Sequence, residues 1–132
     1  MPRPSNTEFA PFYSTYINAT TEQDALDALK QSVLPMTAFL QNLPPQKADY
    51  GYATGKWTIK QVIQHCIDTE RIMAYRALCV ARAETQSLPG FNENEYAAMA
   101  PASHRTLEQV THEMIHLRSN TVLLFESFSA SD

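Results

Sequence analysis

Hydrophobic residues recur at helical spacing along three stretches of the chain, and each stretch predicts an amphipathic helix. The first stretch predicts a helix over residues 22–42. Its apolar positions are Leu26, Leu29, Val33, Met36, Phe39 and Leu40, and Leu43 continues the pattern directly after it. Thr21, followed by Asp24, is a weak N-cap signal for this helix. Pro35 falls inside the pattern and should kink or split the helix, because proline has no amide hydrogen to donate. A pair of prolines ends it.

The second and third stretches carry clear start signals. Each begins with a threonine and, three positions later, a glutamine, which is a capping-box signature: Thr58 with Gln61, and Thr106 with Gln109. We therefore expect helices over residues 58–84 and 106–127. The intervening residues 85–105 form a long connection, with a short helical turn at residues 93–99.

Several aromatic residues precede the first helix: Phe9, Phe12, Tyr13 and Tyr16. Disordered segments are poor in aromatic residues, so residues 1–20 are predicted to form an arm that packs across one end of a helical bundle. Composition agrees with an all-α fold, because the chain has only three glycines and a β-sandwich would need more of them in its turns. With 132 residues, a single domain over residues 1–132 is expected.

Charge and apolar runs exclude several classes of partner. The formal net charge is −4, whereas nucleic-acid binding needs a basic face. No run of about 18 apolar residues predicts a membrane-spanning helix, and the N-terminal residues lack the apolar core of a signal peptide. Cys66 and Cys79 lie on one predicted helix at a separation of about 20 Å, which is too far for a disulfide. The expected location is the reducing cytoplasm.

A histidine and a glutamate on the second predicted helix point to a polar site inside a bundle. At about 100° per residue, His65 lies about 60° to one side of Val62, at the border of the stripe predicted to be buried. The members of this stripe are Val62, Ile59, Cys66, Met73, Ala77 and Val80. Glu70 lies about 80° to the other side, inside the apolar sector, where a carboxylate is costly without a partner. Asp68 lies nearer the outer side. A border histidine alone is usually structural, but the combination with a core-facing glutamate indicates a polar site.

The third predicted helix contains the zinc-peptidase pattern H-E-x-x-H, at His112, Glu113 and His116. Relative to Val110, the apolar face of this helix is centred at about +20°, whereas His112 falls at about 200° and His116 at about −120°. Both histidines are therefore expected to point to solvent. No histidine follows His116, so a third ligand would have to be a later carboxylate.

The remaining candidates carry weaker signals. Cys66 is interpreted as a small buried hydrophobic residue, although a thiol beside His65 could be reactive. His104 precedes a predicted helix and is expected at the surface. Three tyrosines could line or fill a pocket: Tyr50, Tyr52 and Tyr75.

Short motifs also follow one another in a set order along the chain. They are Pro11-Phe12-Tyr13, Gly55-Lys56-Trp57-Thr58-Ile59, His65 with Asp68-Thr69-Glu70-Arg71, Leu88-Pro89-Gly90-Phe91, and Leu117-Arg118-Ser119. This ordered set resembles the DinB-like family of metal-binding helical proteins. The resemblance implies a DinB-like four-helix bundle with up-down topology and a long crossover connection.

The resemblance also implies a metal site and a chemistry. Family members hold a divalent metal ion, often nickel or zinc, through one histidine of the second helix, here His65, and two histidines of the fourth. Some relatives transfer low-molecular-weight thiols such as bacillithiol, mycothiol or glutathione, or isomerise maleylpyruvate. The first hypothesis is therefore a metal-dependent enzyme, a thiol S-transferase or a hydrolase-like enzyme, acting on a small-molecule substrate.

The fourth helix of the family, with its Gly-His-x-x-His-His pattern, has no counterpart in this sequence. A truncated form, a gene fragment and a true three-helix form all remain open as explanations. Three helices of a four-helix bundle would leave an apolar groove uncovered, so we expect a homodimer. The alternative hypothesis is a non-catalytic helical domain that acts through self-association, and metal content separates the two.

Overall fold

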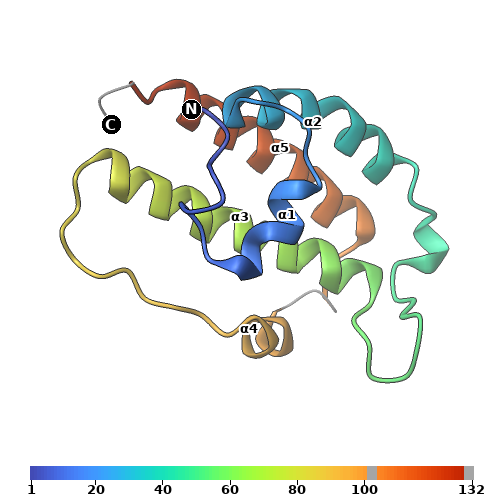
Figure 1. Ribbon diagram of the computed structural model, residues 1–132. Helices are drawn as coiled ribbons and strands as arrows, with labels where there is room; N and C mark the ends of the chain where they lie inside the picture. Colours follow the sequence, from blue (N-terminus) through green and yellow to red (C-terminus); the bar gives the residue numbers. More distant parts are fainter. Residues whose placement is uncertain (101–103, 130–132) are drawn as a thin grey trace.

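The computed structural model describes residues 1–100 and 104–129, and within these residues the chain is all-α. Its body consists of three long helices, α2 (Ala25–Gln41), α3 (Ile59–Ala81) and α5 (Leu107–Glu126). Shorter helical segments are η1 (Pro11–Tyr13), α1 (Ser14–Asn18), η2 (Pro45–Lys47) and α4 (Glu93–Met99). Helix α5 packs against both α2 and α3 and joins them (Figure 1). None of the described helices is sufficiently long and apolar to span a membrane.

Local chemistry fixes where the long helices begin. The side chain of Thr58 accepts a hydrogen bond from the Gln61 amide at 3.3 Å, and the Gln61 side chain accepts one from the Thr58 amide at 2.8 Å. The same capping box opens α5 at Thr106 and Gln109, so both predicted boxes are confirmed. Helix α2 differs, because it begins after Asp24 and not after Thr21. The Asp24 carboxylate accepts hydrogen bonds from the amides of the first turn.

Helix α2 runs through Pro35 without interruption, so the prediction that this proline could split the helix is wrong. Pro35 is exposed, and the carbonyl that loses its hydrogen-bond donor belongs to the exposed Gln31. Water can therefore satisfy this carbonyl. Packing of the helix against α5 on either side of the proline outweighs the lost backbone bond.

The hydrophobic core lies where the second half of α2 meets α5 and the first half of α3. Its buried members are Leu40, Ile63, Ile67, Leu107, Val110 and Met114. The apolar face predicted for α5 is therefore confirmed. On α3 the outcome is different: Ile63 and Ile67 face α5, while Val62 and Met73 of the predicted buried stripe are 46% and 39% exposed.

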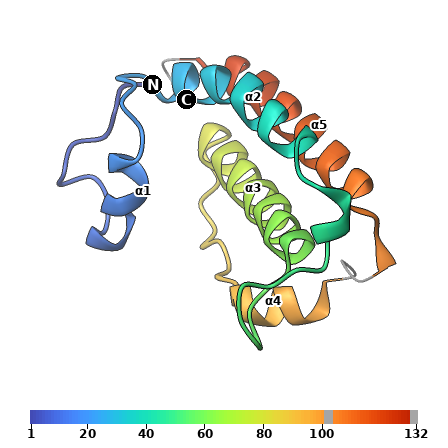
Figure 2. The same ribbon diagram turned by 90° about the vertical axis from the view of Figure 1, so that its right-hand side faces the viewer.

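Residues 1–23 form an arm that stands apart from the three-helix body (Figure 2). The Arg3 side chain donates hydrogen bonds to the carbonyl oxygens of Ile17, Thr20 and Glu22 and so ties the arm into a closed loop. The chain start is joined to α2 by an ion pair of 2.7 Å between the Met1 amino group and Asp24. Most of the arm's aromatic side chains are exposed. The arm is folded, as predicted, but the prediction that its aromatic residues pack across the end of the bundle is wrong.

Candidate functional site

His65 lies in the second turn of α3, close to the start that the capping box fixes. Its side chain is half-buried, and its ring packs against the indole of Trp57 with ring centres 5.0 Å apart. Trp57 directly precedes the N-cap residue, so the same loop-to-helix junction positions both rings. The Trp57 indole therefore covers part of the His65 imidazole, and the His65 side chain also lines an open groove.

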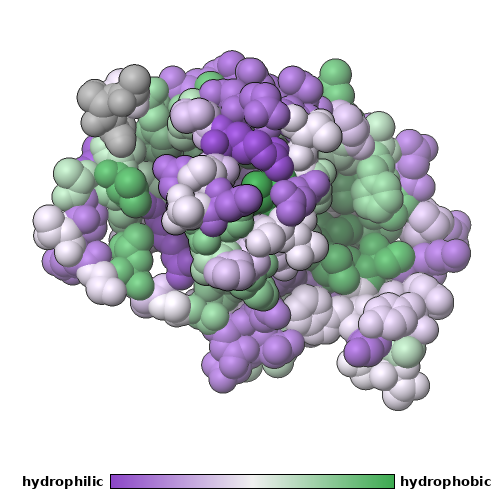
Figure 3. All heavy atoms as spheres, in the orientation of Figure 1, coloured by the Kyte–Doolittle hydropathy of each residue, from purple (hydrophilic) through white to green (hydrophobic). Residues whose placement is uncertain are grey.

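The groove runs between α2 and α3, with side chains of α5 at its base, and has a volume of about 620 Å³. Apolar side chains make most of its wall, among them Leu29, Met36, Phe39, Val62 and Met73. Figure 3 shows hydrophobic surface between α2 and α3 beside the arm. Tyr16 of the arm also lines the groove. A groove of this size and polarity has the dimensions of a small-molecule site.

The polar chemistry of the groove centres on Glu70, whose predicted need for a partner is met by Arg118 of α5. The Arg118 guanidinium donates to both carboxylate oxygens at 2.9–3.1 Å, and its remaining nitrogen donates to the Ser32 hydroxyl at 2.6 Å. The Glu70 and Arg118 side chains are 10% and 20% exposed. One charged pair thus connects all three long helices, which explains how a carboxylate is tolerated in an apolar sector.

Sequence reasoning identified Glu70 but not Arg118. A signal for it was present, because Arg118 lies about 80° from Val110 on α5, at the edge of the apolar face of that helix. The sequence places a core-facing glutamate on one helix and an arginine at the edge of the apolar face of another. This combination could have predicted an ion pair between them.

Cys66 corrects an expectation, because its side chain is exposed and not a buried hydrophobic residue. It lies on the groove side of α3, next to His65. Desolvation in the groove, aided by the nearby Glu70 carboxylate, raises the pKa of the Cys66 thiol, although Arg118 opposes this. At neutral pH the thiol is therefore protonated and a poor nucleophile. Cys66 and Cys79 are both free, as their spacing predicts.

Thr69 holds an unsatisfied polar group beneath the wall of the groove. Its hydroxyl oxygen is buried and lacks a hydrogen-bond partner, and the residue lines the groove one helical turn after His65. Asp68 turns away, and its carboxylate accepts a hydrogen bond from Gln64 at 3.0 Å. Tyr50, Tyr52 and Tyr75 are exposed and do not line this groove.

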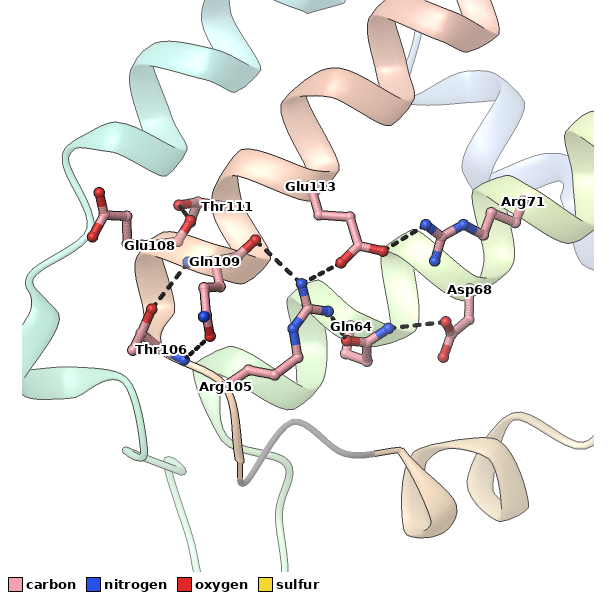
Figure 4. A network of polar contacts seen from close by, with 9 residues as sticks. All are labelled: Gln64, Asp68, Arg71, Arg105, Thr106, Glu108, Gln109, Thr111 and Glu113. Carbon is pink, nitrogen blue, oxygen red and sulfur yellow. Dashed lines mark hydrogen bonds and ion pairs between the residues drawn. The ribbon is translucent and has the colours of Figure 1, made fainter.

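The H-E-x-x-H pattern of α5 does not form a peptidase-like metal site in the described residues. His112 and His116 are both exposed, as predicted, and their ring centres are 6.2 Å apart. Glu113 is held between two arginines: Arg71 of α3 at 2.6 Å, and Arg105, which lies just before α5 (Figure 4). A carboxylate engaged in this way is not free to act as a general base.

The two arginines also set the charge of Glu113. Burial raises the pKa of its carboxyl, but the hydrogen bonds from Arg105 and Arg71 outweigh burial and hold the pKa below its usual value. Arg105 further donates to the Gln64 side chain at 2.7 Å, which extends the network to α3 (Figure 4). The network fastens α3 to the start of α5, and it lies outside the groove that His65 lines.

Comparison with protein families adds a decisive observation. The family model of the DinB superfamily matches residues 25–132, which includes all three long helices. The chain belongs to the DinB superfamily. A search of curated proteins finds no match.

A solved structure from the same family supports the fold. YfiT from Bacillus subtilis superposes with a TM-score of 0.67 at 16% sequence identity, and the match covers 85% of this chain. The chain spans 66% of the length of that structure, which is described as "a probable metal-dependent hydrolase with an unusual four-helix bundle topology". The DinB-like, all-α bundle expected from the sequence is therefore confirmed.

The DinB-superfamily assignment raises the question whether the described residues fit a metal ion. Among residues 1–100 and 104–129, no three His, Cys, Asp or Glu side chains come together in a way that could hold one. His65, Cys66 and Glu70 share the groove, but both oxygens of Glu70 are bound by Arg118. These residues do not fit a three-ligand site on their own, and His65 as a metal ligand stays a prediction.

Proposed function

We propose that this chain is part of a metal-dependent enzyme of the DinB superfamily in which His65 supplies one ligand of a divalent nickel or zinc ion. The observation that carries the proposal is the position of His65, half-buried at the edge of a groove of about 620 Å³. Its remaining ligands would come from outside the described residues. The description of YfiT as a probable metal-dependent hydrolase supports the same assignment.

The groove also suggests the class of substrate. Its walls are largely apolar, and its charged residues Glu70 and Arg118 neutralise each other. Such a surface suits a small, largely apolar molecule with a few polar groups, and the His65 imidazole lies where it can contact one of these groups. Hydrolysis and thiol S-transfer are the two reactions we propose.

The raised pKa of Cys66 bears on the choice of nucleophile. A thiol that stays protonated at neutral pH is a weak nucleophile, so Cys66 is not the group that we propose to attack substrate. In a thiol transfer the reacting sulfur would instead belong to a low-molecular-weight thiol. The alternative function, a non-catalytic helical domain, is favoured by the lack of a complete ligand set among the described residues.

Metal content of the purified, untagged chain tests the proposal. After dialysis against nickel or zinc, elemental analysis should find bound metal in the wild type, at less than one ion per chain because the described residues supply one ligand, and a clear loss in His65→Ala. The matched control is the double variant His112→Ala/His116→Ala, because exposed imidazoles one helical turn apart can bind such metals by themselves. This control should keep its metal.

Two results would overturn the proposal. Metal that disappears from the double variant but not from His65→Ala would place the ion on the solvent face of α5. A wild-type chain that takes up neither metal after dialysis against each would leave the non-catalytic helical domain as the function.

A further inference from the structure

The connection between α3 and α4 runs back along α3, and a second pocket lies between them (Figure 1). This connection pocket has a volume of about 280 Å³, and among the described residues it shares no lining side chain with the groove. Its lining residues are Arg71, Ile72, Tyr75 and Arg76 of α3, residues 88–91 of the connection, and Tyr96 of α4. The pocket therefore exists only while the connection is held against α3.

Arg76 is the residue that holds the connection in place. Its guanidinium donates a hydrogen bond to the Pro89 carbonyl oxygen at 2.7 Å and lies over the Phe91 ring, 5.9 Å from the ring centre. Phe91 in turn meets Tyr96 edge to face, with ring centres 5.3 Å apart. A guanidinium group and an aromatic wall thus lie side by side in one pocket.

The positive charge of this pocket is not balanced by the protein. Arg76 is half-buried, yet among residues 1–100 and 104–129 no carboxylate pairs with it. A partly desolvated charge without a counter-charge costs free energy. Arg71 has only a share of a counter-charge, because it and Arg105 both bind the single carboxylate of Glu113. The pocket is therefore positively charged in a chain whose formal net charge is −4.

Acidic residues of the same helices do not supply the missing charge. Among the described residues, no aspartate or glutamate lines the connection pocket. Asp68 of α3 accepts a hydrogen bond from Gln64 at 3.0 Å, outside the pocket. Glu95 of α4 accepts one from Asn92 at 3.2 Å, also outside it. A bound anion would therefore provide the counter-charge that Arg76 lacks.

The size and the walls of the pocket define the rest of the ligand. A volume of about 280 Å³ lies just below the range of about 300–1,000 Å³ that holds drug-sized molecules, so the ligand is a small one. The walls are aromatic and aliphatic, and a bare inorganic anion would gain nothing from them. A single aromatic ring would pack against Phe91 and Tyr96 in the offset or edge-to-face contacts that such rings favour.

We propose that the connection pocket binds a small aromatic carboxylate, with its ring against Phe91 and Tyr96 and its carboxylate at Arg76. The planar guanidinium matches the geometry of a carboxylate and forms charge-assisted hydrogen bonds with it. Arg71 adds a second positive charge at the same pocket. This inference depends neither on a metal ion nor on the function of the groove.

The test is a titration of the ¹⁵N-labelled full chain with benzoate, followed by NMR. The amide signal of Gly90, which lies in the pocket wall, should shift and reach saturation. Acetate lacks the ring and benzamide lacks the charge, so each should bind about tenfold more weakly or worse. Arg76→Gln should weaken benzoate binding by a similar factor. The control Arg82→Gln removes the same charge just after α3, outside the pocket, and should bind as the wild type does.

A second variant separates lost charge from a loosened connection, because Arg76→Gln also releases the Pro89 carbonyl. Arg71→Gln leaves that contact in place and should still weaken benzoate binding several-fold. Three results would overturn the proposal: no saturable shift at Gly90, benzamide that binds as tightly as benzoate, or unchanged benzoate binding in both arginine variants. Shifts at Val62 and Cys66 in place of Gly90 would put benzoate in the groove and would overturn it too.

Discussion

At the scale of single residues, the pair formed by Glu70 and Arg118 carries the greatest energetic consequence. Both side chains are largely removed from water, and their charges are matched by three hydrogen bonds. Removing one partner of such a pair leaves the other charged and desolvated, which costs far more than the pair itself contributes.

Arg118→Met is expected to lower the free energy of unfolding by about 2–4 kcal/mol, because it leaves the Glu70 carboxylate without its counter-charge. Glu70→Leu combined with Arg118→Met should cost less than Arg118→Met alone, since no buried charge remains. Urea denaturation followed by circular dichroism at one fixed protein concentration measures both values.

The exposed ion pair between Lys30 and Glu126 is the matched control, with side chains that are 45% and 39% exposed. Lys30→Met should cost less than about 1 kcal/mol, as surface pairs do. A double variant as unstable as Arg118→Met would show that lost packing, and not the unpaired charge, causes the effect.

The candidate site could be predicted only in part from single residues. The spacing of α3 placed His65 at a border and Glu70 among apolar neighbours, and both positions agree with the structure. The prediction for Cys66 was wrong for a physical reason. A helical wheel shows which residues share a face, but burial also depends on whether another element covers that face, and nothing in the described residues covers this one.

At the scale of elements, helix boundaries were the most predictable feature. The starts of α3 and α5 follow from capping boxes. In a capping box, the side chains and the backbone of four consecutive residues suffice to define the N-terminus of a helix. The start of α2 was less certain, because Thr21 and Asp24 are both suitable caps and only the fold decides between them. The continuity of α2 through Pro35 depends on its packing against α5, which local sequence does not contain.

Pro35→Ala should raise the free energy of unfolding by about 2 kcal/mol, because the new amide can donate to the carbonyl of Gln31. The exposed position leaves room for this change without repacking. Pro45→Ala is the control: Pro45 is the first residue of η2, where no helical hydrogen bond is missing, and its replacement should give no gain. Thermal and urea unfolding would reveal the difference, and equal effects at both positions would contradict this explanation.

At the scale of the whole molecule, the arm and the three-helix body behave as two parts with few shared contacts. The class of fold was predictable, because three amphipathic stretches with few glycines admit little else. The shape of the arm was not, since it depends on Arg3 reaching carbonyl groups 14 to 19 positions away along the chain.

Arg3→Ala should release the arm while leaving the body folded. Chymotrypsin is then expected to cleave after the aromatic residues of η1 and α1 at least several-fold faster than in the wild type, with the circular dichroism signal of the long helices unchanged. Arg82→Ala is the control, because within residues 1–100 and 104–129 the Arg82 side chain donates a hydrogen bond only to the adjacent Ala81 carbonyl. Unchanged cleavage in Arg3→Ala would mean that the arm is held by other contacts.

The open apolar face of α3 has a thermal consequence. Apolar surface that stays in contact with water in the folded chain contributes nothing to the heat-capacity change of unfolding. With 9207 Å² still accessible, a single chain buries about 15% less surface than a compact protein of its mass, and its heat-capacity change should be smaller in similar proportion. The stability of the isolated chain should therefore vary slightly less with temperature than that of a compact protein of its mass, and covering the open face would restore the difference.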